Sequence, residues 1–469
     1  MKRKVYCMIL LFCAALVILW ANEEKSRTIT QETRIHQHME DNEKEVPEDY
    51  NERFSTHLPL VLIDTQGNEI IQEETVDCKI SIIDNEDAYN YPEDTPQVDT
   101  WATIRIRGNS SSRFDKKQYR ITFVEEKGSD KEADYPVMGM KAESDWVLNA
   151  PYLDKTLMRN YMMYNISGEI MDWAPNVRFC EMMLNGEYMG LYLMIEKIKV
   201  SENRLNLTEI EKGQTETSYL ISREREGQQE VPLNNFGTYT AKTANEVGIN
   251  YPSARKLTDV WKEYIRDDLS DIEKALYSLD YDEWDYGYAR YLDVDSFVDY
   301  FIINEFSMNM DAGVLSTYAY KDLRGKLTMG PVWDFNNSFD NFKAKAFPVN
   351  DFNMKSYPWF VMLCRDEIFV DLVIERYHEL RESVLSEEYL MQYLDDTREY
   401  LGDAIERNFE VWGYSFQKPE LHPRSRDLHS YEEAIGQLKT CIHERGTFMD
   451  EHIDILKQFC AESSVKEYN

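Results

Sequence analysis

The sequence predicts an α+β protein, with a β-rich first part and a helical second part. Two observations support this fold class. Between residues 58 and 198, short apolar runs alternate with polar residues and are separated by turn residues, as in half-buried strands. From residue 257 onward the apolar residues recur at helical spacing. With 469 residues, of which 43% are hydrophobic, the chain is long and apolar enough for an ordered protein of two or three lobes.

The start of the chain has the pattern of an export signal or a membrane anchor. Positive residues at positions 2–4 precede an apolar run of seventeen residues, Val5 to Ala21. Leu19 stands two residues before Ala21, where a cleavage site prefers a small side chain. We therefore predict a signal peptide or membrane anchor at residues 1–21 and favour an uncleaved anchor. The protein is then membrane-anchored or secreted, with its body outside the cytoplasm. Residues 22–55 are charged and poor in aliphatic side chains, which predicts a flexible polar tether.

Residues 56–256 are expected to form a β-rich N-terminal lobe. Candidate strands lie at 60–63 and 78–83 and on both sides of a polar turn within 105–123. The dipeptide Asn185-Gly186 divides the run 177–198 into two further strands and is a strong hairpin signal.

Two segments interrupt these strands. Residues 157–170 have helical apolar spacing, with Asp154 or Thr156 as the expected N-cap. Residues 209–250 are polar and rich in turn residues around a single strand at 219–221, which predicts a surface insertion.

Residues 257–465 are expected to form a helical C-terminal lobe. Helical spacing is clear at 260–279 and 294–308, and residues 359–463 read as almost wholly helical. A short β-hairpin is expected between them, at 316–320 and 327–333.

Charge and cysteine content limit the partners. A formal net charge of −34 argues against nucleic acid as the main partner, because affinity for a phosphate backbone needs a broad positive surface. The same charge attracts cations, including divalent metals. The five cysteines beyond residue 21 are widely spaced and form no Cys-x-x-Cys pair, so neither a disulfide scaffold nor a zinc site is expected.

The run from Arg105 to Phe123 concentrates six positive side chains in nineteen residues of this acidic chain. Its two ends alternate as strands do, so the run predicts a strand, a polar turn and a second strand. Backbone N–H groups around Gly108, together with Arg107 and Lys117, could hold phosphate oxygens. The alternative is a solvated hairpin with a charged rim, which the spacing by itself favours.

Two oxygen-rich turns follow regular elements in the second half of the chain. Asn309 and Asp311 come just after an apolar helix, and Asp334 lies in a polar run, 330–340, that follows the short hairpin. Mg²⁺ usually takes one or two protein carboxylates together with substrate phosphates, so Asp311 and Asp334 suffice in number. The alternative, that both residues only cap turns, carries about equal weight.

Two further charged residues stand in apolar surroundings. Glu196 ends an otherwise apolar strand, where a charge is usually paired or solvated, and it could pair with a phosphate-binding lysine or arginine. Arg159 lies on the apolar helix after Asp154 and is interpreted as a member of a structural ion pair.

Several short motifs, in order along the chain, resemble those of the spore-coat protein H (CotH) kinase family. The matching segments are Arg107-Gly108-Asn109-Ser110-Ser111, Lys116-Lys117-x-Tyr119-Arg120, Asp145 to Pro151 with Asp154, Arg159 and Asn160, Leu184 to Glu196, Asn309-x-Asp311, Pro331-x-Trp333-Asp334 and Tyr357-Pro358-Trp359. The resemblance covers roughly residues 56–460, and the number of independent motifs in the same order makes it specific.

The resemblance implies an atypical protein-kinase-like fold that binds ATP with Mg²⁺ or Mn²⁺. It also implies phosphorylation of protein serines, including those of spore-coat proteins, so the expected partners are ATP and a protein acceptor, and the spore coat is an expected location. Phosphoryl transfer depends mainly on positioning and charge neutralisation, for which the residues present are chemically sufficient.

The family's motifs also assign roles to residues of this chain. Phosphate contacts would fall to Arg107, Asn109, Ser110 and Lys117, with Glu196 orienting the basic group and Trp333 packing around the nucleotide. Asp311 would be the catalytic or metal-binding aspartate, and Asp334 would bind the metal.

Two positions depart from the family's pattern. Asn336 stands where a second aspartate is often found, and Asp340 stands where glycine is common. Asn336 can bind the metal, but it is neutral and a weaker magnesium ligand than a carboxylate, and Asp340 could compensate from the same turn. Because both principal aspartates are retained, we expect an ATP-dependent phosphotransferase. The alternative is a non-catalytic coat-assembly or surface protein that keeps the fold for binding.

Overall fold

The computed structural model describes residues 34–40, 44–50, 52–211, 213–240, 242, 245–283 and 285–461. The predicted membrane segment, residues 1–21, and the start of the predicted tether lie outside the described residues. Among the described helices, none has the length and apolar character that crossing a bilayer requires. The described residues form a mixed α+β structure, as predicted.

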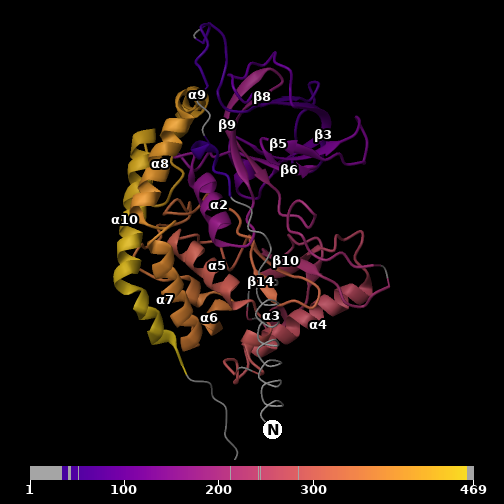
Figure 1. The fold of residues 1–469 in the computed structure, drawn as a ribbon, viewed down its shortest axis with the longest axis vertical. Helices are drawn as coiled ribbons and strands as arrows, with labels where there is room; N and C mark the ends of the chain where they lie inside the picture. Colours follow the sequence, from indigo (N-terminus) through magenta and orange to yellow (C-terminus); the bar gives the residue numbers. More distant parts are fainter. Residues whose placement is uncertain are drawn as a thin grey trace, which may run out of the picture.

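Strands from the first part of the chain close into a barrel, which lies at the top of Figure 1. They are β1 (Leu60–Asp64), β2 (Val76–Ile83), β3 (Val98–Arg107), β4 (Gln118–Val124), β7 (Asp145–Asn149), β8 (Val177–Leu184) and β9 (Glu187–Glu196). Neighbouring strands pair antiparallel, except that β1 closes the barrel by pairing in parallel with β8. Inward-facing side chains such as Ile80, Phe123, Trp146 and Tyr192 fill the barrel with a core of its own.

Both predicted hairpins of this part are confirmed. β3 and β4 pair across a polar turn that contains a short 3₁₀ helix, Ser111–Arg113. β8 and β9 meet at Asn185 and Gly186, whose φ angles of 52° and 81° are the left-handed values that this kind of two-residue turn requires. A small separate ribbon, β5 (Tyr135–Val137) and β6 (Met140–Glu143), follows β4 in the chain.

A second sheet has the strand order β11-β12-β10-β13-β14. Its strands are β10 (Tyr219–Glu224), β11 (Pro232–Leu233), β12 (Glu246–Tyr251), β13 (Thr317–Lys321) and β14 (Leu327–Met329). β10 pairs on both sides, with β12 and β13, and Tyr219 is fully buried. The prediction of a surface insertion at 209–250 is therefore wrong. This polar, turn-rich segment contains β10, which is the central strand of the second sheet. This sheet takes strands from both sides of residue 256, where the sequence predicts the change from a β-rich to a helical lobe.

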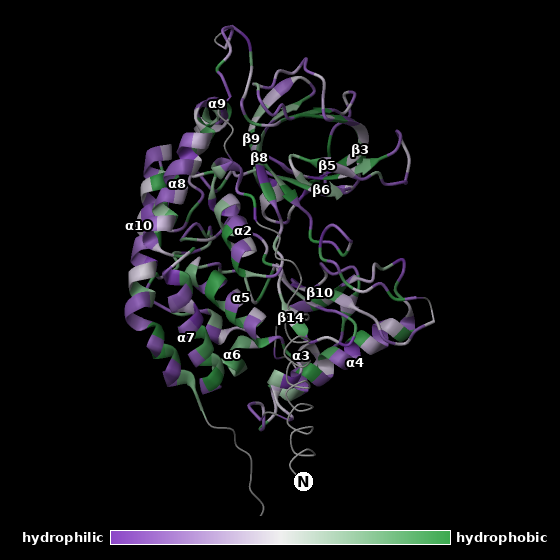
Figure 2. Cartoon of the chain, viewed as in Figure 1, coloured by the Kyte–Doolittle hydropathy of each residue, from purple (hydrophilic) through white to green (hydrophobic). Residues whose placement is uncertain are grey.

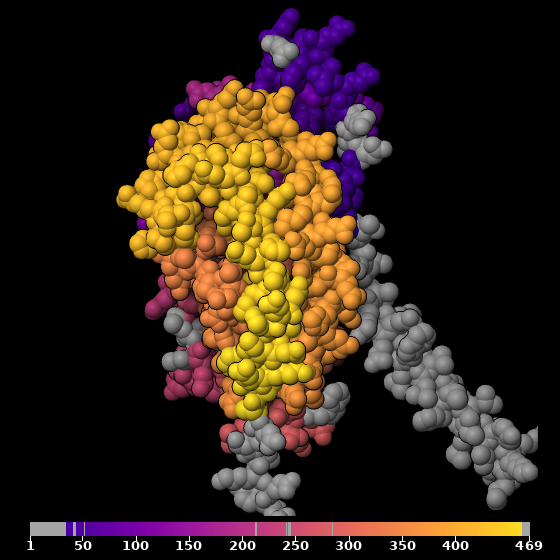
Figure 3. All heavy atoms as spheres, turned by 90° about the vertical axis from the view of Figure 1, so that its left-hand side faces the viewer, coloured from indigo at the N-terminus to yellow at the C-terminus, as the bar shows by residue number. Residues whose placement is uncertain are grey.

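The rest of the described chain is mainly helical. The helices are α2 (Arg159–Ile170), α3 (Phe236–Tyr239), α4 (Asp259–Leu276), α5 (Val294–Phe306), α6 (Phe360–Leu363), α7 (Glu367–Arg381), α8 (Glu387–Leu401), α9 (Asp403–Trp412) and α10 (Tyr431–His452). Figure 3 shows α10, in yellow, on the outer face of this helical part. In Figure 2 hydrophilic residues are frequent on α8 and α10, whereas α5 and α6 carry the hydrophobic residues that face the interior.

Helix α2 lies in the interior between the barrel and the helical part. Ten of its twelve residues are buried, and its apolar residues are not confined to one face, which is the pattern of a helix covered on all sides. The expected N-cap is wrong: Met158 occupies that position, and Asp154 instead accepts a hydrogen bond from the Arg159 backbone N–H at 2.9 Å. Arg159 forms the predicted structural ion pair with Asp154 at 2.6 Å, with both side chains buried.

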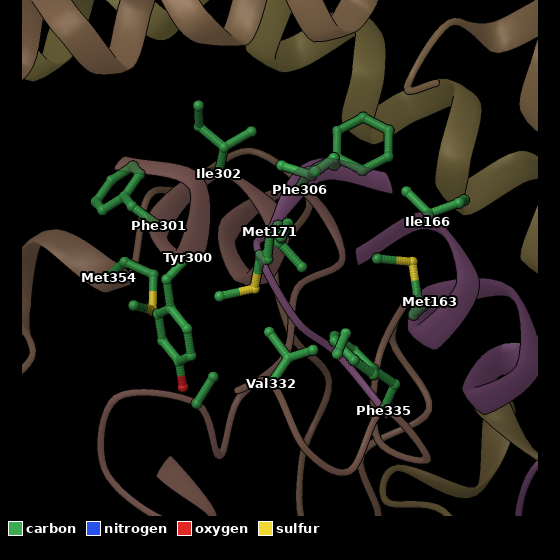
Figure 4. Close-up of a cluster of buried hydrophobic side chains, with 14 of the residues drawn as sticks. Met163, Ile166, Met171, Tyr300, Phe301, Ile302, Phe306, Val332, Phe335 and Met354 are labelled. Carbon is green, nitrogen blue, oxygen red and sulfur yellow. The ribbon is translucent and has the colours of Figure 1, made fainter. Parts of the chain in front are cut away.

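A large apolar core joins α2 and α5 to the segment that follows β14. Figure 4 shows Met163 and Ile166 of α2, Phe306 of α5, and Val332 and Phe335 of that segment around one cluster. Val332 and Phe335 are fully buried. The backbone between these two residues is therefore held in the core at both ends.

Residues 34–40, which we call the N-terminal strap, pack against the body of the protein. The strap contains a short 3₁₀ helix, Gln37–Met39, and Gln37 exchanges hydrogen bonds of 3.1 and 2.7 Å with the backbone of Phe179 in β8. The prediction of a flexible tether is wrong for these residues. The Gln37 amide and His38 Nδ1 have hydrogen-bond partners in β8 and α2, which replace bonds that water would otherwise supply.

Candidate functional site

A cleft of about 900 Å³ lies between the outer face of the barrel, α2, the end of β10 and the loops that follow α5 and β14. One wall is basic and comes from the turn between β3 and β4. The opposite wall is acidic and comes from the two loops. The wall residues on which the site depends are Arg105, Arg107, Gly108, Asn109, Ser110, Arg113, Gln118, Asn149, Asn160, Tyr164, Glu224, Asp311, Trp333, Asp334, Asn336 and Asn337.

Seven of the nine predicted site residues line this one cleft, and two do not. The seven are Arg107, Asn109 and Ser110 from the basic turn, Asp311 from the loop after α5, and Trp333, Asp334 and Asn336 from the loop after β14. More than 200 residues of sequence separate the basic turn from the two aspartate loops, and the fold brings them together.

Lys117 and Glu196 lie outside the cleft lining. Lys117 donates from Nζ to the carbonyl of Ser112 at 2.9 Å and so closes the basic turn from behind. Glu196 is 1% exposed and pairs with the buried Arg204 at 3.0 Å. Side chains alternate along a strand, so Ile195 faces the cleft while Glu196, opposite Trp146 in the register, faces the other way. Glu196 therefore does not meet the basic turn.

The basic turn carries positive charge that no carboxylate of the turn neutralises. Gly108 has a φ of 101°, which allows the chain to reverse directly after Arg107. The Arg107 guanidinium lies over the ring of Trp333 at 5.4 Å and so contacts the opposite loop. Burial, and then the positive charges of Arg120 and Arg107, lower the pKa of Arg105. A site with this surplus of positive charge favours an anion.

Asp334 is held in a conformation that non-glycine residues rarely adopt. Its φ is 62°, and its backbone N–H donates to the Tyr164 hydroxyl at 3.0 Å. Val332 and Phe335, on either side, are anchored in the apolar core shown in Figure 4. Strained backbone of this kind persists where the surrounding structure fixes it, and it is concentrated at functional sites.

A chain of side-chain hydrogen bonds runs from the basic wall to the acidic wall. Its links are Arg107 to Gln118 (3.3 Å), Asn149 to Gln118 (2.8 Å), Asn160 to Asn149 (3.1 Å), Asn160 to Asn336 (2.9 Å) and Asn336 to Asp334 (2.7 Å). Asn160 also accepts the Phe335 N–H at 2.8 Å. Asn160 is therefore the residue through which α2 fixes the loop of Asp334.

Four residues of the cleft have no role predicted from the sequence: Gln118, Asn149, Asn160 and Tyr164. Asn149 and Asn160 stood within the family-like motifs, so that signal could have singled them out. Nothing in the sequence distinguishes Tyr164 from the other buried residues of α2.

Asp311 and Asp334 lie near each other on the acidic wall. Burial, and then the charge of Asp334, raise the pKa of Asp311, while a hydrogen bond of 2.9 Å from Asn337 to its Oδ2 opposes the shift. Glu224, at the end of β10, is a further carboxyl group in the cleft, and no sequence pattern singles it out. Burial is the main cause that raises its pKa to about 7, and the charges of Asp334 and Asp311 add to the shift.

The donor set suits a metal that is also bound by a substrate. No group of three or more His, Cys, Asp or Glu side chains in the described part of the chain is arranged to hold a metal by itself. Hydrogen bonds from described residues reach Asp311 only at Oδ2 and Asp334 only at Oδ1, so each carboxylate keeps one oxygen for a ligand. Mg²⁺ binds in this way, through one or two carboxylates and substrate phosphates.

Asp340 does not compensate for the asparagine at position 336. Its carboxylate pairs with Arg426 at 2.9 Å and accepts the Phe347 N–H at 2.8 Å, and it does not line the cleft. Its φ of 58° shows that it occupies the left-handed conformation suited to the glycine common at this position of the family.

Comparisons with known proteins show which family this chain resembles. A family model described as CotH kinase protein matches residues 104–449, a range that contains the whole cleft lining. Inner spore coat protein H of Bacillus subtilis (strain 168) is 30% identical over 95 residues, which cover 20% of this chain and 23% of that protein. The match thus spans less than a quarter of the curated relative.

Proposed function

The chain belongs to the CotH kinase protein family, and from this premise we propose that it is an ATP-dependent phosphotransferase that phosphorylates serine residues of a protein acceptor. The observation that carries the proposal is that a basic turn and two aspartate loops, far apart in sequence, line one cleft. Basic groups and backbone N–H groups suit phosphate oxygens, and the aspartates suit a divalent metal.

The fit of ATP with Mg²⁺ or Mn²⁺ rests on the complementarity of the two walls. Arg107, Asn109 and Ser110 would contact the phosphates, and Trp333 offers an aromatic surface next to Arg107. Asp334 would hold the metal through its available oxygen, with Asn336 as a weaker ligand, and Asp311 would either join them or act as the catalytic base. When bound, the metal supplies neutralisation of phosphate charge.

In the proposed reaction the serine Oγ forms a bond to the γ-phosphorus of ATP, and the bond from that phosphorus to the bridging oxygen of ADP breaks. The serine proton passes to a carboxylate of the protein. Asp311 is the candidate acceptor, because it lines the cleft and its Oδ1 accepts no hydrogen bond from a described residue. Asn160 keeps the loop of Asp334 in place during this step.

We further propose that the protein acts in the spore coat, because the family match and the name of its curated relative both indicate a CotH-type coat protein. Asn336 favours a second candidate, a coat-assembly or surface protein that binds ligands in this cleft without catalysis. A neutral amide at this position provides less metal affinity than the aspartate common in the family.

Transfer of label from γ-labelled ATP, with Mg²⁺ or Mn²⁺ and candidate acceptors, tests the proposal. Asp311→Asn and Asp334→Asn should abolish incorporation, whereas Asp271→Asn, an exposed aspartate on α4, should leave it unchanged. If the wild type incorporates no label but binds ATP, the non-catalytic candidate is correct. If the wild type neither incorporates label nor binds ATP, both candidates fail.

A further inference from the structure

We propose that Arg34, in the N-terminal strap, is a positioning residue for this site. It binds the side of α2 that faces away from the cleft and thereby keeps the backbone of Asp334 in position. The inference rests on the function proposed above. It gives a segment outside the family match an effect, through α2, on the loop that carries Asp334.

The guanidinium of Arg34 is bound to the middle of α2 and to the segment that follows the helix. It donates to the carbonyls of Tyr164 at 3.1 Å, of Ala174 at 2.8 Å and of Pro175, and to Oδ1 of Asn165 at 3.3 Å. One side chain thus joins four acceptors on α2 and on the segment that follows it.

Tyr164 of α2 contacts both Arg34 and Asp334. Its carbonyl accepts from Arg34, and its side chain reaches Asp334 on the side of the helix that faces the cleft. The Tyr164 hydroxyl accepts the Asp334 N–H at 3.0 Å, and the Tyr164 ring lies 5.7 Å from the rings of both Trp333 and Phe335. A displacement of α2 at Tyr164 therefore reaches the backbone of Asp334 through one side chain.

The strap has a second attachment on the preceding turn of α2. The backbone N–H of His38 lies 3.1 Å from the Tyr161 hydroxyl, and His38 Nδ1 lies 2.8 Å from it. The strap consequently bonds to the helix at Tyr161, Tyr164 and Asn165, while Asn160 and Tyr164 face the cleft. The strap and the loop that carries Asp334 lie on opposite sides of one buried helix, α2.

Gly168 shows how closely the strap fits. A Cβ atom at Gly168 would lie 2.6 Å from Arg34 Nη1, so a side chain there would displace the guanidinium. In an ordinary helix the change from glycine to alanine is stabilising, by roughly 0.5–1 kcal/mol. Gly168→Ala is therefore a way to disturb Arg34 without removing any hydrogen-bonding group of the site.

The test compares the full-length wild type with Arg34→Ala, Gly168→Ala and the double variant. Since misplacement of about 1 Å can cost a hundredfold in rate, we expect each single variant to lower kcat on the order of tenfold. The KM for ATP should change little, because the basic turn is not touched. The double variant should be no slower than Arg34→Ala, since Gly168→Ala acts only by displacing Arg34.

Hydrogen exchange of residues 333–337 supplies a readout that does not need activity. In Arg34→Ala the amides of this loop should exchange faster, while those of α10 should exchange as in the wild type. Unchanged exchange of the loop would overturn the inference. So would faster exchange of the loop and α10 to the same extent, because Arg34 would then contribute only global stability. Faster exchange of the loop in a protein that transfers no phosphate would leave the positioning role in place and reject the proposed function instead.

Discussion

The side-chain amide of Asn336 donates to Oδ1 of Asp334 at 2.7 Å, while its carbonyl oxygen accepts from Asn160 at 2.9 Å. Asn336 thus stands at the position of a frequent family aspartate and serves as a link between α2 and Asp334. Without a bound metal, an amide here holds the carboxylate of Asp334 by a hydrogen bond. A second carboxylate would repel it.

Asn336→Asp should therefore lower the stability of the metal-free protein and raise its affinity for a divalent metal. Without metal, the lost hydrogen bond and the added like charge should lower the free energy of unfolding by about 1–3 kcal/mol. With Mn²⁺ or Mg²⁺, the rise in Tm should exceed that of the wild type, because a second carboxylate is available as a ligand. Asn336→Leu removes the same hydrogen bond without adding a ligand, so it should lose stability and gain no metal response. An equal metal response in Asn336→Asp and the wild type would show that position 336 does not face the metal.

Asn160→Ala should lower phosphoryl transfer, because Asn160 holds the loop that carries Asp334. It leaves the Phe335 N–H and the Asn336 carbonyl without their partner, which costs about 1–3 kcal/mol of stability. The expected kinetic result is a lower kcat with a smaller change in the KM for ATP. Ser167→Ala on the same helix is the control, since the buried Ser167 hydroxyl has no hydrogen-bond partner among the described residues. A kcat of Asn160→Ala equal to that of the control would contradict the role given to Asn160.

Glu224 should make stability depend on pH between 4.5 and about 7, the interval through which its pKa is raised in the folded state. In this interval the folded protein keeps a proton that the unfolded chain releases, so the free energy of unfolding falls as pH rises. Glu224→Gln cannot titrate and should lose less stability over the same interval. Urea unfolding of both proteins at pH 5 and pH 7 measures the difference. If the free energy of unfolding depends on pH in the same way in both proteins, the pKa of Glu224 is not raised by folding.

Arg445 should be essential for the stability of the helical part. It pairs with Glu305 at 2.6 Å, both side chains are buried, and it donates to the carbonyls of Val349 and Asp351 at 2.6 and 2.7 Å. Arg445→Met leaves a buried charge uncompensated and should lower the free energy of unfolding by about 3–5 kcal/mol.

An exposed pair provides the control for Arg445. Arg398 and Glu432 join α8 to α10 at the surface, with side-chain exposures of 41% and 67%, so Arg398→Met should change stability little. Equal losses in the two variants by denaturant unfolding would contradict the distinction between buried and exposed pairs.

The sequence predicted elements whose signal is local. The Asn185-Gly186 turn and the alternation on both sides of the polar turn were enough to locate two hairpins of the barrel. Helical spacing located α2 and α5 to within a few residues. The basic turn and the two aspartate loops could be singled out because polar and charged residues are concentrated there.

Features that depend on tertiary contacts could not be predicted in this way. β10 lies at the centre of a sheet although its neighbours in sequence are polar, and only its pairing with β12 and β13 reveals that place. Glu196 could not be assigned to a face without the register of β9. Tyr164 and Asn160 lie on a helix that is buried on all sides, so no amphipathic pattern indicates which side meets Asp334.

The central claim is that Asp334 and the basic turn bind one nucleotide together with its metal. Isothermal titration of the wild type and of Asp334→Asn with ATP, each in the presence and absence of Mg²⁺, tests it most directly. We predict that Mg²⁺ strengthens ATP binding by the wild type and that Asp334→Asn loses this metal-dependent gain. ATP binding that is equally strong in both proteins, with the same response to Mg²⁺, would contradict the claim.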